Sequence, residues 1–168
     1  MPAWTTSDKG AAFIAATESF SPKAYQPGDG TNTIGYGHAI RPNEVSLLAK
    51  VLTKDEGLTL FKQDLHSREA QVLQHLDSRL MTQSRFDALM SFVFNCGIGN
   101  ALNMDKSQFS FHWKAGHVQE AAECLCNWGT SQWAKFPGLK IRRCKEALML
   151  LDGETSPVVN KRAAELHL

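Results

Sequence analysis

Two acids near the start of the chain, Glu18 and Asp29, have carboxylates that could act together on a glycosidic bond. Glu18 follows an apolar segment, and Asp29 lies in a turn rich in proline and glycine. Thr33 opens a run in which apolar residues alternate with glycines, and this predicts a strand of a hairpin. Two acids beside a short hairpin suit glycoside hydrolysis. An ordinary helix-to-hairpin junction with solvated acids is the alternative.

Residues 18–38 resemble the catalytic segment of the phage-type lysozymes (the muramidases of glycoside hydrolase family 24). In that family a Glu is followed, after eight residues, by Asp or Cys and then, after five more, by a Thr that opens a T-I-G-x-G-H run. Glu18 and Thr33 have this separation, and residues 33–38 read T-I-G-Y-G-H. The family's Asp position falls on Pro27, and the only acid of the turn, Asp29, comes two residues later. The second carboxylate therefore departs from the pattern.

The resemblance implies a role for each residue of this segment. Glu18 would be the general acid, and Thr33 would hold the attacking water together with Asp29. A solvated turn aspartate is the alternative for Asp29, and a strand threonine favoured for its β-branch is the alternative for Thr33. His38 is expected to support the hairpin through a hydrogen bond to an acid such as Asp64, without a catalytic role.

The candidate substrate-binding residues are Asn95, Trp128 and Tyr36. The family places an amide near the position of Asn95 to contact substrate, whereas a helix cap is the alternative. The aromatic rings could stack on sugars, although tryptophan at such spacing is also common in a core. Arg142 or its neighbour Arg143 could reach Glu18 and influence its ionisation, and a solvated helix face is the alternative.

The apolar periodicity predicts an α+β protein, and the resemblance implies a lysozyme-like fold with a small β-hairpin lobe and a larger helical lobe joined by a long helix. We expect a single domain over residues 1–168. The hairpin lobe should cover about 18–52, the connecting helix about 53–76, and the helical lobe about 77–168 together with the N-terminal helix.

Local signals predict where the helices begin and end. Thr6 or Ser7 should cap a first helix that ends near Phe20, and Thr53 with Glu56 forms a capping box. One further predicted helix starts after Thr82. Three others cover residues 107–114, 117–128 and 139–151. The tail after residue 152 has only a weak pattern. Residues 85–97 and 138–146 resemble the family's buried helix and closing helix.

The composition limits the choice of partners. The formal net charge of +1 is too balanced to argue for nucleic acid. The cysteines Cys96, Cys124, Cys126 and Cys144 lack the C-x-x-C spacing of a zinc site, so we expect buried free thiols, with a disulfide formed after release left open. We expect no metal and no cofactor.

No apolar run is long enough to span a bilayer, and the first ten residues lack the features of a secretory signal. We therefore expect no stable membrane insertion. We also expect a monomer that stays in the host bacterial cytoplasm before release and then acts at the periplasmic cell wall.

The resemblance implies a peptidoglycan hydrolase that cleaves the β-1,4 bond between N-acetylmuramic acid and N-acetylglucosamine. An endolysin, a secreted effector (with an immunity or inhibitor protein as partner) and a phage-tail lysozyme would look alike at this level. Two alternatives stay open. A catalytically inactive lysozyme-fold module could bind glycan or build a particle, and a related chitinase-type glycosidase could act on a similar sugar backbone.

Overall fold

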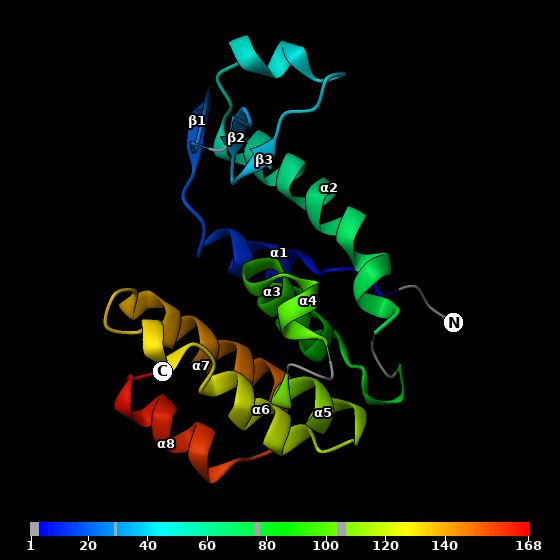
Figure 1. Cartoon of the computed structure of the whole chain (residues 1–168), viewed down its shortest axis with the longest axis vertical. Helices are drawn as coiled ribbons and strands as arrows, with labels where there is room; N and C mark the ends of the chain where they lie inside the picture. The colour runs from blue at the N-terminus through cyan, green and yellow to red at the C-terminus, as the bar shows by residue number, and fades with distance from the viewer. Residues whose placement is uncertain (1–3, 29, 76–77, 104–106) are drawn as a thin grey trace. The chain divides into compact units, whose positions relative to one another are not determined.

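The computed structural model describes residues 4–28, 30–75, 78–103 and 107–168 (Figure 1). The chain divides into two compact units, and each is described by itself. The first unit is Thr6–Arg68, and the second joins the start of the chain, through Thr5, to Glu69–Leu168. The single domain over residues 1–168 stays a prediction.

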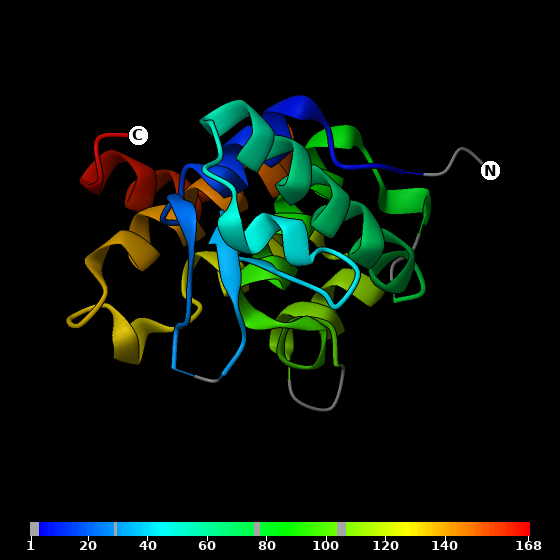
Figure 2. The same ribbon diagram turned by 90° about the horizontal axis from the view of Figure 1, so that it is seen from above.

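The first unit combines helices with a small antiparallel sheet, in agreement with the predicted α+β class. Its elements are, in order, α1 (Asp8–Ala15), β1 (Ser21–Tyr25), β2 (Thr33–Gly35), β3 (His38–Ala39), the 3-10 helix η1 (Val45–Ala49) and the part of α2 (Lys54–Leu73) that ends at Arg68. The strands are hydrogen-bonded in the order β1-β2-β3, with Tyr25 paired to Thr33 and Thr33 to Ala39. Figure 2 shows β1 and β2 side by side.

The first helix begins as predicted but ends earlier than expected. The hydroxyl of Ser7 accepts a hydrogen bond from the amide of Gly10 at 3.0 Å, which confirms the cap. The helix ends at Ala15, not near Phe20. The amides of Thr17 and Glu18 donate to the carbonyls three residues earlier, at 3.0 and 3.1 Å, and this tighter winding closes the helix.

The long helix α2 starts with the predicted capping box. The backbone amide of Thr53 donates to Glu56 Oε2 at 2.8 Å, and the amide of Glu56 donates back to Thr53 Oγ1 at 3.2 Å. Lys50 Nζ lies 2.8 Å from Glu56 Oε1. The hydrogen bond from Lys50, together with that from the amide of Thr53, lowers the pKa of Glu56 to about 2.

The second unit is helical. It contains η2 (Ser78–Leu80), α3 (Gln83–Cys96), α4 (Ile98–Ala101), α5 (Gln108–Lys114), α6 (Val118–Cys126), η3 (Thr130–Gln132), α7 (Pro137–Leu151) and α8 (Pro157–Glu165). Helix α7 packs against α3, α6 and α8 (Figure 1). Every residue of α3 from Phe86 to Val93 is buried, as its almost continuous apolar pattern predicts. The hydroxyl of Thr82 accepts from the amide of Arg85 at 3.3 Å and confirms the predicted cap.

The structure corrects two expectations in this unit. Helix α7 begins at Pro137, two residues before the predicted start at 139, because the N–H that proline lacks would have no carbonyl partner at the first position of a helix. The weakly patterned tail forms α8, capped by Ser156, whose hydroxyl accepts from the amide of Val159 at 3.3 Å. No helix among the described residues is both long and apolar enough to cross a membrane.

We expect Glu56→Gln to destabilise the protein in a pH-dependent way. The folded pKa of Glu56 is about 2, below its ordinary value of 4.5, so the ionised carboxylate stabilises the fold above pH 4.5 and loses this effect as the pH falls towards 2. Urea unfolding of the wild type and the variant should therefore differ at pH 7 and converge between pH 4.5 and 2. Asp55→Asn is the control, because it removes a charge from the same turn but leaves the capping box intact. A difference that is constant with pH would contradict the assignment.

Candidate functional site

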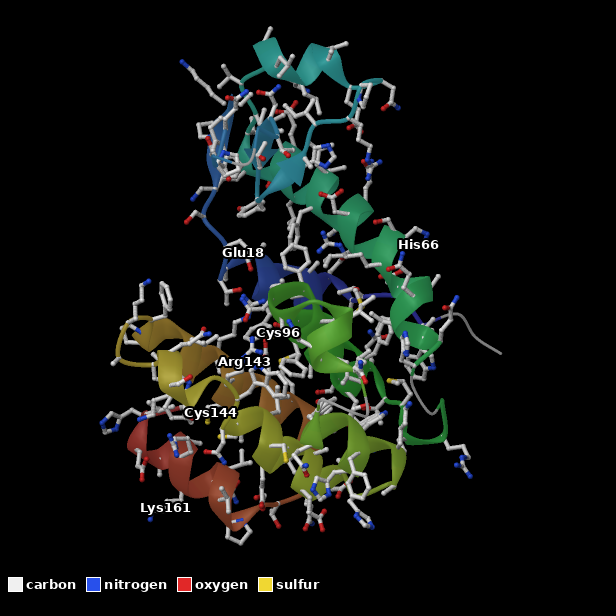
Figure 3. The ribbon with its side chains drawn as sticks, in the orientation of Figure 1. Glu18, His66, Cys96, Arg143, Cys144 and Lys161 are labelled. Atoms are coloured by element: carbon white, nitrogen blue, oxygen red, sulfur yellow. The ribbon has the colours of Figure 1, made fainter. Side chains whose placement is uncertain are left out.

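Glu18 lies on the wall of a pocket of about 350 Å³ in the first unit. The side chain is half-buried in the bend that follows α1. The pocket is lined by Ala12, Ala15, Ala16, Glu18, Phe20, Tyr36, Lys54 and Leu58. All of these side chains except Glu18, Lys54 and the hydroxyl of Tyr36 are apolar, so one carboxylate is presented in a largely apolar hollow. Figure 3 shows Glu18 just beyond the end of α1.

Two aromatic rings form one side of this pocket. The rings of Phe20 and Tyr36 lie 5.0 Å apart, and Tyr36 in turn lies 5.8 Å from Phe61 of α2. Gly57 makes this packing possible, because a Cβ at that position would come within 2.6 Å of the Phe20 ring. Tyr36 therefore lies on the same pocket as Glu18, where an aromatic face could receive a sugar ring.

The hairpin holds Thr33 on the middle strand of its sheet. Thr33 is only 7% exposed and pairs with both neighbouring strands. Gln26 Nε2 donates to Asn32 Oδ1 at 3.1 Å and closes the base of the turn. Asp29, the expected second carboxylate, lies outside the described residues, so its role stays a prediction.

His38 is held between two carboxylates, which confirms the predicted bond to Asp64 and adds a second acid. The ring is 2% exposed. Its Nδ1 lies 2.9 Å from Asp64 Oδ2, and its Nε2 lies 3.1 Å from Glu44 Oε2. The amide of Arg41 also donates to Glu44 Oε2, at 2.9 Å, and this bond is the main cause that lowers the pKa of Glu44.

The imidazole therefore ties β3 to α2 and to the loop before η1. The bond to Asp64 was expected from the resemblance, which gives the histidine of the T-I-G-Y-G-H run a supporting role in the hairpin. The bond to Glu44 was missed, since nothing in an irregular loop shows which way a glutamate will turn.

In the second unit, Asn95 lies near the end of α3 and is exposed. Arg143 Nη2 donates to Asn95 Oδ1 at 3.1 Å, and Arg143 Nη1 lies 3.3 Å from Cys96 Sγ. Figure 3 shows Arg143 of α7 beside Cys96. Burial raises the pKa of the Cys96 thiol, and the charge of Arg143 opposes this rise.

A fully buried carboxylate organises the two arginines. Glu146 Oε1 accepts hydrogen bonds from Ser91 Oγ at 2.5 Å, Arg142 Nε at 3.1 Å and Arg143 Nη2 at 3.0 Å. Arg143 Nε lies 3.0 Å from Glu146 Oε2, close enough for an ion pair but not aligned for a hydrogen bond. Burial raises the pKa of Glu146 and lowers that of Arg143, while the opposite charges counteract both shifts.

This cluster was not anticipated. The sequence reading left a solvated surface open for Arg142 and Arg143, whereas both side chains are buried. Arg142 Nη2 also donates to the carbonyl of Ser91 at 3.1 Å. A Glu three or four residues after two arginines on a buried helix was the available signal. The influence of Arg142 on Glu18 stays a prediction.

Trp128 is half-buried and packs edge-on against Phe92 of α3, with ring centroids 5.0 Å apart. A stacking role on sugar rings stays a prediction for this residue.

All four cysteines are free, and Cys126 and Cys144 are buried. Burial is the main cause that raises the pKa of the Cys126 thiol to about 12, and an unreactive thiol is the result. Among the residues that the structure describes, no group of three or more His, Cys, Asp or Glu side chains could hold a metal ion.

Comparisons with known proteins agree with this architecture. Residues 15–146 match the family model described as phage lysozyme. The chain is 31% identical over 160 residues to an endolysin of Bacillus phage B103, an alignment that covers 90% of this chain and 56% of that protein. This chain thus spans little more than half the length of that curated relative.

Two solved structures extend the similarity to the fold. An endolysin from Escherichia coli O157:H7 phage FAHEc1 has a TM-score of 0.67 and 28% identity, over 90% of this chain and 96% of that one. A variant of P22 lysozyme has a TM-score of 0.70 and 26% identity, over 88% of this chain and 98% of that one. These similarities confirm the predicted lysozyme-like fold.

We expect His38→Ala to lower the free energy of unfolding by about 2–4 kcal/mol, because it removes hydrogen bonds to two carboxylates and leaves them facing a void. Arg41→Ala is the matched control. Arg41 approaches Asp64 only at 3.5 Å from a side chain that is 56% exposed. Its loss should therefore cost less than about 0.5 kcal/mol. Equal losses in urea unfolding would contradict the imidazole's role.

We expect Glu146→Gln to cost about 3–5 kcal/mol of unfolding free energy, because two buried guanidinium groups would lose their carboxylate. The control is Glu165→Gln, which breaks an arginine pair of the same i,i+3 spacing on an exposed helix face, where Arg162 Nε lies 3.6 Å from Glu165 Oε2. That change should cost at most about 0.5 kcal/mol. A small loss for Glu146→Gln in the same measurement would show that the cluster adds little to stability.

Proposed function

Because this chain belongs to the phage lysozyme family, we propose that it hydrolyses bacterial peptidoglycan with Glu18 as the general acid. The bond we assign is the β-1,4 linkage between N-acetylmuramic acid and N-acetylglucosamine. Hydrolysis of such a bond needs a proton donor for the departing oxygen and a group that stabilises the sugar cation or delivers water to it.

The observation that supports this proposal most directly is the position of Glu18 in its pocket. The carboxyl group lies on a hollow whose other walls are mostly alanine, leucine and aromatic side chains. Such a surface suits the apolar face of a sugar ring and limits the water around the acid. Tyr36 shares this pocket and is the aromatic contact that we assign to the glycan.

The delivery of water is assigned to Thr33, with Asp29 as its partner. The strand pairing of Thr33 holds its backbone in place, which suits a residue that must position a nucleophile. Asn95 and Trp128 are the contacts that we assign to the glycan from the second unit.

A second candidate is a lysozyme-fold module that binds glycan without cleaving it. Pro27 favours this reading, because it occupies the position where the family carries its second carboxylate. A chitinase-type glycosidase is a third candidate, because its sugar backbone differs from that of peptidoglycan only by the lactyl group. Peptidoglycan is the partner that we propose, with action at the bacterial cell wall. The monomeric state, the lack of nucleic-acid binding and an inhibitor protein stay predictions.

Loss of turbidity of purified peptidoglycan tests the proposal. We expect the wild type to clear the suspension and Glu18→Gln to lower the rate by about 10²- to 10⁴-fold, the range for loss of a general acid. Glu120→Gln, an exposed glutamate of α6, is the matched control and should retain the wild-type rate. Asp29→Asn and Thr33→Ala, measured in parallel, test whether Thr33 positions the water together with Asp29 or without it. If only the threonine variant fails, Thr33 acts without Asp29.

The same preparations distinguish the alternatives. Wild-type protein that binds the sacculus in a pull-down but releases no reducing ends would replace the hydrolase with the binding module. Faster cleavage of chitin oligomers than of peptidoglycan would identify the chitinase-type enzyme. Reducing ends on N-acetylmuramic acid would support the assigned bond, and reducing ends on N-acetylglucosamine would contradict it.

A further inference from the structure

The guanidinium group of Arg143 is fixed on several sides within the second unit. Glu146 accepts from its Nη2 at 3.0 Å, and the ring of Phe92 lies 5.0 Å from its Cζ. The whole side chain is buried. A planar, delocalised cation that is buried, held by a carboxylate and lies over an aromatic ring keeps one orientation.

This fixed group determines how the amide of Asn95 is turned. An arginine only donates hydrogen bonds, so the atom of Asn95 that lies 3.1 Å from Arg143 Nη2 must be the carbonyl oxygen Oδ1. The thiol of Cys96 lies 3.7 Å from the same oxygen. Since both neighbours occupy the carbonyl side, the NH₂ group points away from Arg143. Asn95 is exposed, and its Nδ2 has no hydrogen-bond partner among the residues that the structure describes.

We propose that Glu146 and Arg143 are positioning residues that fix the amide of Asn95 so that its NH₂ group donates to an oxygen of the bound glycan. The acetamido carbonyl of an N-acetylated sugar is the acceptor that suits an amide donor. The inference rests on the proposed function, because it takes peptidoglycan as the ligand. The proposal explains what fixes the side chain of Asn95. Without Arg143, the amide could rotate and present either its oxygen or its NH₂ group to the glycan.

Ser91 also helps to hold Glu146 in place. Ser91 Oγ donates to Glu146 Oε1 at 2.5 Å, and this oxygen also receives Arg142 and Arg143. Ser91 on α3 therefore helps to hold Glu146 in the orientation in which it meets Arg143. The chain of contacts runs from Ser91 to Glu146, then to Arg143 and finally to Asn95. The proposed role does not require any of these groups to gain or lose a proton.

Arg143→Lys tests the proposal, because lysine keeps the charge but lacks the planar group that reaches Glu146 and Asn95 together. With soluble peptidoglycan fragments, we expect KM to rise about tenfold while kcat stays within about twofold, as for an interaction used in binding alone. Asn95→Ala should have a similar effect. In the double variant the KM should equal that of Asn95→Ala, because Arg143 acts through the amide.

Arg162→Lys is the matched control. Arg162 Nη2 lies 3.4 Å from Asn127 Oδ1 on an exposed face, so the same chemical change is made to a second arginine–asparagine pair. We expect KM to stay at the wild-type value in this variant. If Arg143→Lys and Asn95→Ala multiply in their effects on KM, or if Arg143→Lys lowers kcat alone, the proposal is wrong.

A readout that does not depend on turnover separates this inference from the proposed function. The side-chain NH₂ signals of Asn95 in a ¹H–¹⁵N spectrum should be sharp in the wild type and should shift or broaden in Arg143→Lys and in Ser91→Ala, whereas those of Asn127 should not change. Unchanged Asn95 signals would overturn the positioning role even if the enzyme is active. If the wild type binds but does not cleave, the same comparisons are made with the Kd of the fragments.

Discussion

The helical unit depends on the neutralisation of one buried negative charge. The side chain of Glu146 is 0% exposed, and a carboxylate in such a place is tolerated only where donors surround it. Ser91 supplies a hydroxyl from α3, while Arg142 and Arg143 supply guanidinium groups from α7 itself. The register between α3 and α7 is therefore set by polar geometry as well as by apolar packing. A shift of one residue along either helix would remove the bonds that Ser91 makes to Glu146 and Arg142, while the ion pairs within α7 would remain.

The hairpin unit also has a buried polar centre, the imidazole ring of His38. Here a buried ring lies between two carboxylates, Asp64 from α2 and Glu44 from the loop before η1. The sheet is small and β3 has only two residues, so backbone pairing alone gives it little stability. The side-chain contacts of the imidazole compensate for this, and they hold the strand that pairs with Thr33. In both units a candidate functional residue lies next to a polar centre that is itself held from several sides.

The sequence predicted features whose signals are local and missed those that depend on partners far along the chain. The caps at Ser7, Thr53 and Thr82 are confirmed, because a cap is decided within four residues. The bond from His38 to Asp64 was also predicted, because the resemblance gives this histidine a supporting role in the hairpin. The contact with Glu44 and the burial of the two arginines were missed, because their causes lie in an irregular loop and in the packing of α7 against α3. Helix α8 was not predicted because its apolar periodicity is weak, although Ser156 as the cap and Pro157 as the first residue are a common helix start.

The same contrast explains why Thr33 and Asp29 are not equivalent. Tyr25 pairs with Thr33, and Gln26 is bonded to Asn32, so the two sides of the turn are joined up to that point. In the sequence, position 27 directly follows Gln26, whereas position 29 lies midway between Gln26 and Asn32. An acid at position 27 would be tied closely to a strand that is held by its neighbours. Gly28 and Gly30 both have positive φ, a backbone conformation that suits glycine and disfavours other residues at these two positions. Chemistry that needs a fixed group is consistent with the strand pairing that holds the backbone of Thr33, whereas the part assigned to Asp29 stays a prediction.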